Sequence, residues 1–201
     1  MSPSEWGTSH GRVWLQSVTP VAPTTIAEKL QAQLYDAALV QAREALDAHP
    51  ESADAFCAMG QCCQALGRLD QAIQAFGQAH AIDASSSEYA LRYARALRTV
   101  GRFDGAVGVL KSVSATGLSQ AKIELELARI HRDAGPVHLA HLHARAAVEL
   151  NPNDPDSRNV LGNALVAMAD YAGAKVHYQA ALEADDSRTD IAANLANILR
   201  I

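Results

Sequence analysis

The chain has 201 residues, a formal net charge of −5, and 49% hydrophobic but only 5% aromatic residues. The negative charge argues against nucleic acid as the main partner, and no stretch approaches the roughly 18 consecutive apolar residues of a membrane-spanning helix. The N-terminus also lacks the basic segment and apolar run of a secretory signal. We therefore expect a cytoplasmic protein that does not contact membranes.

The first 22 residues differ from the rest of the chain. They contain both tryptophans, Trp6 and Trp14, among serine, glycine and proline, and they do not follow the spacing of the later residues. We predict an irregular N-terminal segment over residues 1–22. Thr25 and Glu28 have the spacing of a capping box, so regular helix is expected to begin there.

A period of 34 residues runs through the remainder of the chain. It is clearest in five alanines, Ala38, Ala72, Ala106, Ala140 and Ala174. Glycine lies five residues before three of them, at Gly67, Gly101 and Gly135. A fixed period of this length marks a solenoid, in which one small unit stacks on copies of itself. Such a chain presents an extended surface.

One period, residues 53–86, has the pattern of two helices joined by a turn. Phe56 and Gly60 belong to a set of apolar and small residues on one face of the first helix. Gly67 is expected to end that helix, because a left-handed turn suits a residue without a Cβ. Ala72 lies on the apolar stripe of the second helix, where a small side chain allows close approach of the pair.

This unit resembles the tetratricopeptide repeat, a 34-residue helix–turn–helix with the pattern W-x2-L-G-x2-Y, then A-x3-F and P. The pattern appears as Phe56, Met59-Gly60, Cys63, Ala72 and Phe76 in the second repeat, and as Leu161-Gly162, Leu165, Ala174 and Tyr178 in the fifth. No repeat carries tryptophan at position 4, and the fourth repeat has Glu124 there.

The resemblance implies an all-α protein, a right-handed α-solenoid (a superhelix) of antiparallel helix pairs over residues 23–201. Five repeats are expected at residues 19–52, 53–86, 87–120, 121–154 and 155–188. Residues 189–201 then form the first helix of a sixth repeat, which is either an imperfect cap or the start of further protein. Self-association through its partly covered apolar stripe is compatible with either interpretation.

In this family the first helices line a concave groove, and positions 2, 5, 6, 9, 12 and 13 of each repeat reach the ligand. Six cations occupy such positions: Arg92, Arg95, Arg98, Lys122, Arg129 and Arg132. Arginine binds carboxylates well through paired hydrogen bonds. The six cations therefore predict a basic stripe that binds an acidic segment of a partner. Alternatively, Glu88, Glu126 and Asp133 pair with these arginines on a solvated face. A ligand would also need apolar contact, for which Leu91 and Leu125 are candidates.

Asparagines occupy groove positions farther along the chain, at Asn159, Asn163, Asn194 and Asn197. They resemble the repeat arm of O-linked N-acetylglucosamine transferases, in which such residues hold the backbone of an extended peptide, because an amide both donates and accepts hydrogen bonds. Chaperone-binding members instead clamp a carboxylate with Lys and Asn at positions 5 and 9. This chain has Cys57 and Gln61 there, so we expect no such clamp.

Two further groups of residues raise the question of metal binding. Cys57, Cys62 and Cys63 form no CxxC pair, so we interpret them as structural, with Cys57 facing the groove as the accessible thiol. The spacing of His138 and His141, near His131 and His143, suits a metal, but no carboxylate lies at matching spacing. We predict neither a metal site nor a cofactor.

The sequence contains no glycine-rich phosphate loop and no nucleophile motif, so we predict that the chain is not an enzyme. Two functional hypotheses remain. The first is a non-catalytic protein–protein interaction scaffold that binds a peptide segment of a partner in its groove. The alternative is the substrate-recruiting arm of a larger enzyme resembling a glycosyltransferase or a sulfotransferase.

Overall fold

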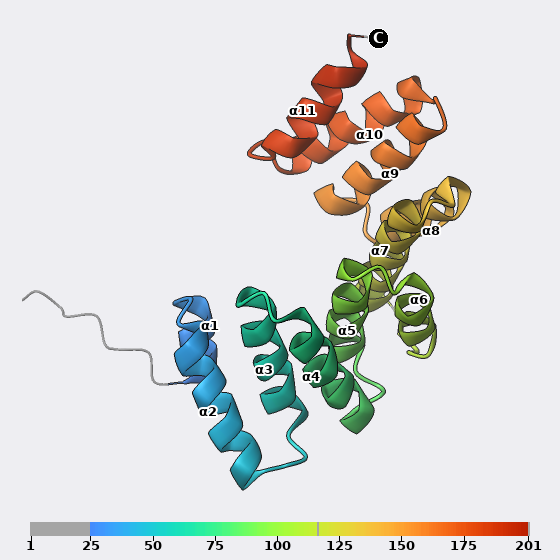
Figure 1. Cartoon of the computed structure of the whole chain (residues 1–201). Helices are drawn as coiled ribbons and strands as arrows, with labels where there is room; N and C mark the ends of the chain where they lie inside the picture. Colours follow the sequence, from blue (N-terminus) through green and yellow to red (C-terminus); the bar gives the residue numbers. More distant parts are fainter. Residues whose placement is uncertain (1–24, 116, 201) are drawn as a thin grey trace, which may run out of the picture.

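The computed structural model describes residues 25–115 and 117–200, which form a curved array of helices without strands (Figure 1). The helices are α1 (Ile26–Gln31), α2 (Tyr35–Ala48), α3 (Ala53–Ala65), α4 (Leu69–Ile82), α5 (Ser87–Thr99), α6 (Phe103–Lys111), α7 (Gly117–Ala134), α8 (Val137–Leu150), α9 (Pro155–Ala167), α10 (Tyr171–Ala184) and α11 (Thr189–Ile198). The predicted all-α solenoid of antiparallel helix pairs is confirmed. The predicted irregular segment 1–22 lies outside the described residues.

The turn inside each helix pair has the same backbone conformation in all five repeats. The second helices begin 34 residues apart, at Tyr35, Leu69, Phe103, Val137 and Tyr171. Two residues before each start, φ is positive, with values of 58° at Gln33, 72° at Gly67, 75° at Gly101, 108° at Gly135 and 62° at Ala169. The predicted left-handed glycine turns are therefore confirmed, and two residues that carry a Cβ adopt the same conformation.

Side-chain caps begin several of the first helices. Ser52, Ser86 and Asp154, again in register with the period, accept hydrogen bonds from the backbone N–H three residues later. The capping box of Thr25 and Glu28 is confirmed, with both reciprocal hydrogen bonds formed.

The junction between the third and fourth repeats departs from the period. Helix α6 ends at Lys111, and α7 begins at Gly117, four residues before the expected position 121. Ser112 caps the end of α6, since its hydroxyl donates to the carbonyl oxygen of Val109 at 2.7 Å. Local hydrogen bonding of this kind competes with helix continuation.

Small residues set the distance between the helices of a pair. The five periodic alanines are at most 1% exposed. At Gly60 an added Cβ would lie 2.6 Å from the ring of Phe76, and at Gly162 it would lie 2.5 Å from the ring of Tyr178. Glycine is therefore required where the facing position of the second helix carries an aromatic residue. The third repeat has Ala94 and Leu110 at the corresponding positions.

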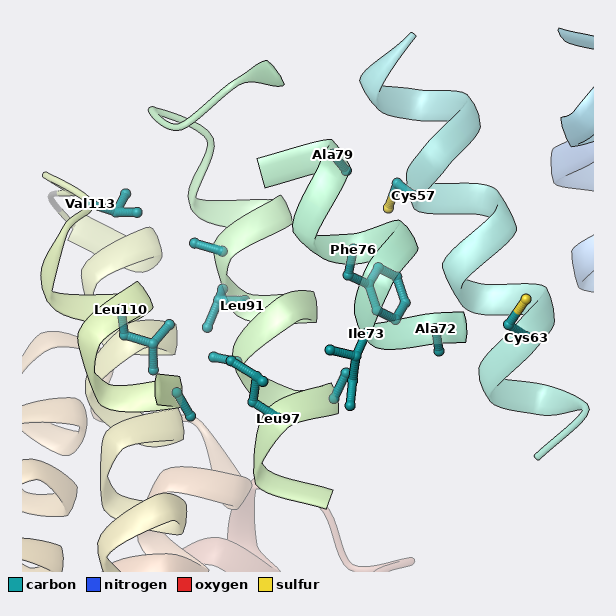
Figure 2. Packing of buried hydrophobic residues seen from close by; sticks show 14 of the residues in the cluster. Cys57, Cys63, Ala72, Ile73, Phe76, Ala79, Leu91, Leu97, Leu110 and Val113 are labelled. Carbon is teal, nitrogen blue, oxygen red and sulfur yellow. The ribbon is translucent and has the colours of Figure 1, made fainter. Parts of the chain in front are cut away.

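The core is a succession of clusters without a single centre. The first extends from α2 to α7, and Figure 2 shows its side chains on α3, α4, α5 and α6. A second cluster lies among α7, α8 and α9, and a third among α9, α10 and α11. Leu165 contacts both the second and the third, so apolar packing continues to the end of the described chain. Each repeat is thus buried by its neighbours.

All three cysteines belong to the first cluster, and the prediction of an accessible thiol at Cys57 is wrong. Its side chain is 7% exposed, and burial raises the pKa of the thiol to about 11. The nearby charges of Arg92 and Glu88 come from α5, the next first helix along the solenoid. Position 5 of the second repeat is therefore buried in the core cluster and does not expose a thiol to solvent.

The strained turn residue Ala169 leads to a first prediction. Replacing it with glycine removes a Cβ from a left-handed conformation that costs roughly 1 kcal/mol. We expect Ala169→Gly to raise the melting temperature by about 2–4 °C in thermal unfolding followed by circular dichroism. The same change at Ala180, inside helix α10, is the control and should destabilise by about 1 kcal/mol. A loss of stability at both positions would contradict the interpretation.

The pair formed by Gly60 and Phe76 gives a second prediction. Gly60→Ala places a methyl group against the ring and is expected to destabilise by about 1–3 kcal/mol. Adding Phe76→Leu, which recreates the pair of Ala94 and Leu110, should recover part of this loss, so the double variant is more stable than the sum of the single effects predicts. Denaturant unfolding of all four proteins measures the coupling, and strict additivity would show that the ring does not require the glycine.

Candidate functional site

The first helices of successive repeats lie side by side. Helix α5 contacts α7, α7 contacts α9, and α9 contacts α11. The predicted cations lie on α5 and α7, and the predicted asparagines lie on α9 and α11. We call the face that these four helices share the groove. It is the part of the molecule in which the predicted site residues gather.

A cavity of about 330 Å³ opens between α5, α7 and the start of α9. Three apolar side chains line it, Leu91, Ala121 and Leu125, each less than a tenth exposed. Its charged lining residues are Glu88, Arg92, Arg95, Lys122, Arg129, Asp154 and Asp156. Four of the six predicted cations therefore meet at one cavity, whereas Arg98 and Arg132 do not line it.

A buried carboxylate binds three of the predicted arginines. Glu126 is 0% exposed and accepts hydrogen bonds from the Nε of Arg95 at 3.0 Å and the Nε of Arg98 at 2.8 Å. Its Oε2 also lies 3.7 Å from Nη1 of Arg129. A buried charge is tolerated only when it is paired in this way, and removing its partners is strongly destabilising. Glu126 therefore joins α5 to α7.

The other predicted cations also have carboxylate partners, with one exception. Asp133 lies 2.6 Å from Arg98 and 2.8 Å from Arg132. Arg92 pairs with Glu88 at 2.7 Å along its own helix. Carboxylates thus pair with all five arginines, as the alternative to a free basic stripe expected, but Glu126 is buried and does not lie on a solvated face. Within the described part of the chain Lys122 alone among the six cations forms no ion pair.

The same pattern continues to α11 through residues that the sequence analysis did not select. Asp156 binds Arg129 at 2.9 Å and Arg188 at 2.7 Å, and Arg188 also binds Asp190 at 2.9 Å. Burial alone would raise the pKa of Asp156, but the hydrogen bonds from Arg188 and Arg129 outweigh it and hold the pKa below its ordinary value.

The asparagines form a small cluster of amides. Asn194 donates to the side-chain oxygens of Asn159 at 3.0 Å and Asn163 at 3.3 Å. The hydroxyl of Tyr178 donates to Asn163 at 2.7 Å. The structure therefore brings three of the four predicted asparagines together, while Asn197 is exposed and stands outside this cluster.

These contacts have a signal in the sequence, because many of them join residues 31 or 35 positions apart. The separation is 31 for Arg95 with Glu126 and for Asn163 with Asn194, and it is 35 for Arg98 with Asp133 and for Asn159 with Asn194. One period minus three, or plus one, brings adjacent first helices into contact. A search for complementary side chains at these two separations would have found these four pairs, but not Arg98 with Glu126 or Arg129 with Asp156, which are 28 and 27 residues apart.

One of the histidines considered for metal binding lies next to a carboxylate, which comes from another helix and therefore could not be seen in the spacing along one helix. Nδ1 of His143 lies 2.7 Å from Oε2 of Glu124, which is 19 residues away on α7. The ring of His131 stacks on that of His143 with centroids 5.2 Å apart, and burial lowers the pKa of His131. Among the described residues no group of three or more His, Cys, Asp and Glu is arranged to hold a metal ion.

None of the helices described here combines the length and the apolar character that crossing a bilayer requires.

The lowered pKa of Asp156 gives a third prediction. Its charge stabilises the fold above the unfolded-state pKa of about 4, and this contribution is lost as the pH falls through the lower folded-state pKa. We expect Asp156→Asn to cost about 1 kcal/mol at pH 7, the upper end for partly exposed pairs, and the difference from wild type to shrink between about pH 5 and 3. Denaturant unfolding against pH measures this, with Asp186→Asn on an exposed turn as the control. A difference that is constant with pH would contradict the assignment.

Comparisons with known proteins agree with the geometry. Two family models, each described as the tetratricopeptide repeat, match residues 32–85 and 65–130. No curated protein matches the chain. Among solved structures, a thermophilic tetratricopeptide-repeat protein of Thermus thermophilus has a TM-score of 0.68 and 20% identity, with coverage of 88% of this chain and 96% of that one.

Two further structures are similar at the level of the fold. PilW, described as a widely conserved type IV pilus biogenesis factor, has a TM-score of 0.75 and 17% identity, covering 87% of this chain and 82% of that chain. MamA from Desulfovibrio magneticus RS-1 has a TM-score of 0.69 and 19% identity, covering 81% and 92%. The 34-residue period and the helix pairs agree with both family models, so residues 32–130 belong to the tetratricopeptide repeat family, whose members are generally protein-interaction scaffolds.

Proposed function

We propose that the chain is a non-catalytic interaction module whose groove binds an extended segment of a partner protein, with an acidic side chain of that segment beside Lys122. The observation that carries this proposal is the cavity between α5, α7 and α9. It combines apolar lining residues with an exposed, unpaired cation. Peptide sites of this kind take an apolar side chain for affinity and a charged one for orientation.

The charges around the cavity favour an acidic residue only slightly. Four cations and three carboxylates line it, which leaves one net positive charge. An exposed ion pair contributes about 0.2–1 kcal/mol, whereas burying an aliphatic side chain contributes about 1.5–3 kcal/mol. Micromolar binding requires about 8.2 kcal/mol. The partner segment therefore needs apolar contact with Leu91 and Leu125 and further contacts along the groove.

A fourth prediction tests this location of the site. Peptides selected from a random peptide library against the wild-type protein should bind Lys122→Glu at least tenfold more weakly, because the charge reversal repels their acidic residue. Fluorescence anisotropy with the labelled peptides measures the affinities. Lys175→Glu is the matched control, since Lys175 is also an exposed lysine but lies on α10, outside the groove.

The two variants separate the groove from other surfaces. Equal loss of affinity in both variants would indicate general electrostatic attraction, and no loss in Lys122→Glu would place the binding site elsewhere. A photo-crosslinking residue introduced at position 122 should label the bound peptide, whereas the same residue at position 175 should not.

The amide cluster on α9 and α11 favours a second candidate function, that of a substrate-recruiting arm of a larger transferase. Asn194 lies within hydrogen-bonding distance of both Asn159 and Asn163, and such amides can hold the backbone of an extended peptide. The natural open reading frame tests this candidate. A frame that continues into a transferase domain would support it, and a stop codon after Ile201 would contradict it.

A further inference from the structure

We propose that Glu126 is a specificity-determining residue that acts as an internal ligand of the groove. By pairing with Arg95, Arg98 and Arg129 and offsetting their charge, it restricts the groove to partner segments with a single carboxylate, placed at Lys122, and disfavours acidic runs. This inference rests on the proposed function of the groove and concerns which partner segments it accepts.

The first support is the position of Glu126. It lies at position 6 of its repeat, one of the positions from which a ligand is reached, yet it is fully buried beneath the arginines that it binds. Two of these arginines, Arg95 and Arg129, also line the cavity. A partner carboxylate that drew Arg95 away from Glu126 would have to displace a charge-assisted hydrogen bond of 3.0 Å and leave the buried carboxylate with fewer partners. Both changes are unfavourable, so Arg95 remains with Glu126.

The second support is the isolation of Lys122. Residues 31 or 35 positions away on the adjacent first helices contact one another elsewhere in the groove. For Lys122 those positions carry uncharged residues, Ser87, Leu91, Asn153 and Ser157. Within the described part of the chain Lys122 also forms no ion pair, so its charge is available to a partner.

The third support is the remaining charge of the cavity. Glu88 pairs with Arg92 on an exposed surface, where such a pair contributes little, so Arg92 can turn toward a carboxylate that is already at Lys122. Asp154 lines the same cavity and, among the described residues, forms no ion pair, so it would repel a second acidic side chain. The site thus suits one carboxylate next to an apolar side chain.

Binding of poly-L-glutamate tests the role of Glu126 without knowledge of the natural partner. We expect wild type to bind this polyanion weakly and Glu126→Gln to bind it at least tenfold more tightly, with a steeper loss of affinity as salt rises. Anisotropy titrations of fluorescent poly-L-glutamate at several salt concentrations provide the measurement. The matched control is Glu149→Gln, an exposed residue on α8 that pairs with Arg145, and it should leave the affinity within twofold of wild type.

A folded Glu126→Gln variant with unchanged affinity for the polyanion would overturn the proposal, and so would an equal gain in Glu149→Gln. If circular dichroism shows that Glu126→Gln does not fold, Asp156→Asn replaces it, because this partly exposed residue occupies Arg129 and Arg188. It should raise the affinity about threefold, and no gain in that variant would contradict the proposal.

The outcome is separable from that of the proposed function. Library peptides that depend on Lys122 but carry several acidic residues would contradict the role of Glu126 while supporting the groove as the binding site. Conversely, a polyanion gain in Glu126→Gln, together with library peptides that ignore Lys122, would support the role of Glu126 in anion selectivity while contradicting Lys122 as the contact of the partner.

Discussion

The close contact between the two helices of each repeat is the constraint on which the rest of the structure depends. It requires buried small residues, seen in the periodic alanines and in Gly60 and Gly162, which leave space for an aromatic ring on the second helix. Because one helix pair cannot bury both of its apolar faces by itself, burial of its apolar side chains is completed only when the next repeat packs against it. Because each repeat packs on its neighbour, the repeats share the same turn between their two helices. Even Gln33 and Ala169 adopt the left-handed conformation that glycine has at this position in the other repeats.

The groove adds a polar connection between repeats to this apolar packing. Glu126 and Asp133 bind arginines of α5, and Asp156 connects α7 to Arg188 beside α11. The positive charge of these arginines is already offset by carboxylates of the fold, so they attract the carboxylate of a partner less strongly than unpaired cations would. A groove that is rich in arginine is therefore not the same as a groove that attracts acidic proteins. Its anion affinity depends on how many cations the fold leaves unpaired.

Features set by local interactions could be predicted from the sequence. The capping box at Thr25, the glycine turns and the helix pairs involve residues close in the chain, and all are confirmed. The early end of α6 was not predicted. Ala106, near the start of that helix, follows the 34-residue period, whereas the hydrogen bond of Ser112 that ends the helix is not a feature of the repeat pattern. The burial of Cys57 was missed for a different reason, since it depends on packing within a core cluster that several helices share.

The sequence by itself determined the repeat, its length, the helix pairs and the family, because these follow from periodic small and apolar residues. It also selected the residues of the candidate groove. Only the tertiary structure decided which of these charges are paired, because ion pairing depends on side chains that lie about one period apart on different helices. The tertiary structure thus shows that Lys122 differs from the five arginines in lacking an ion pair, and that Glu126 pairs with three of those arginines.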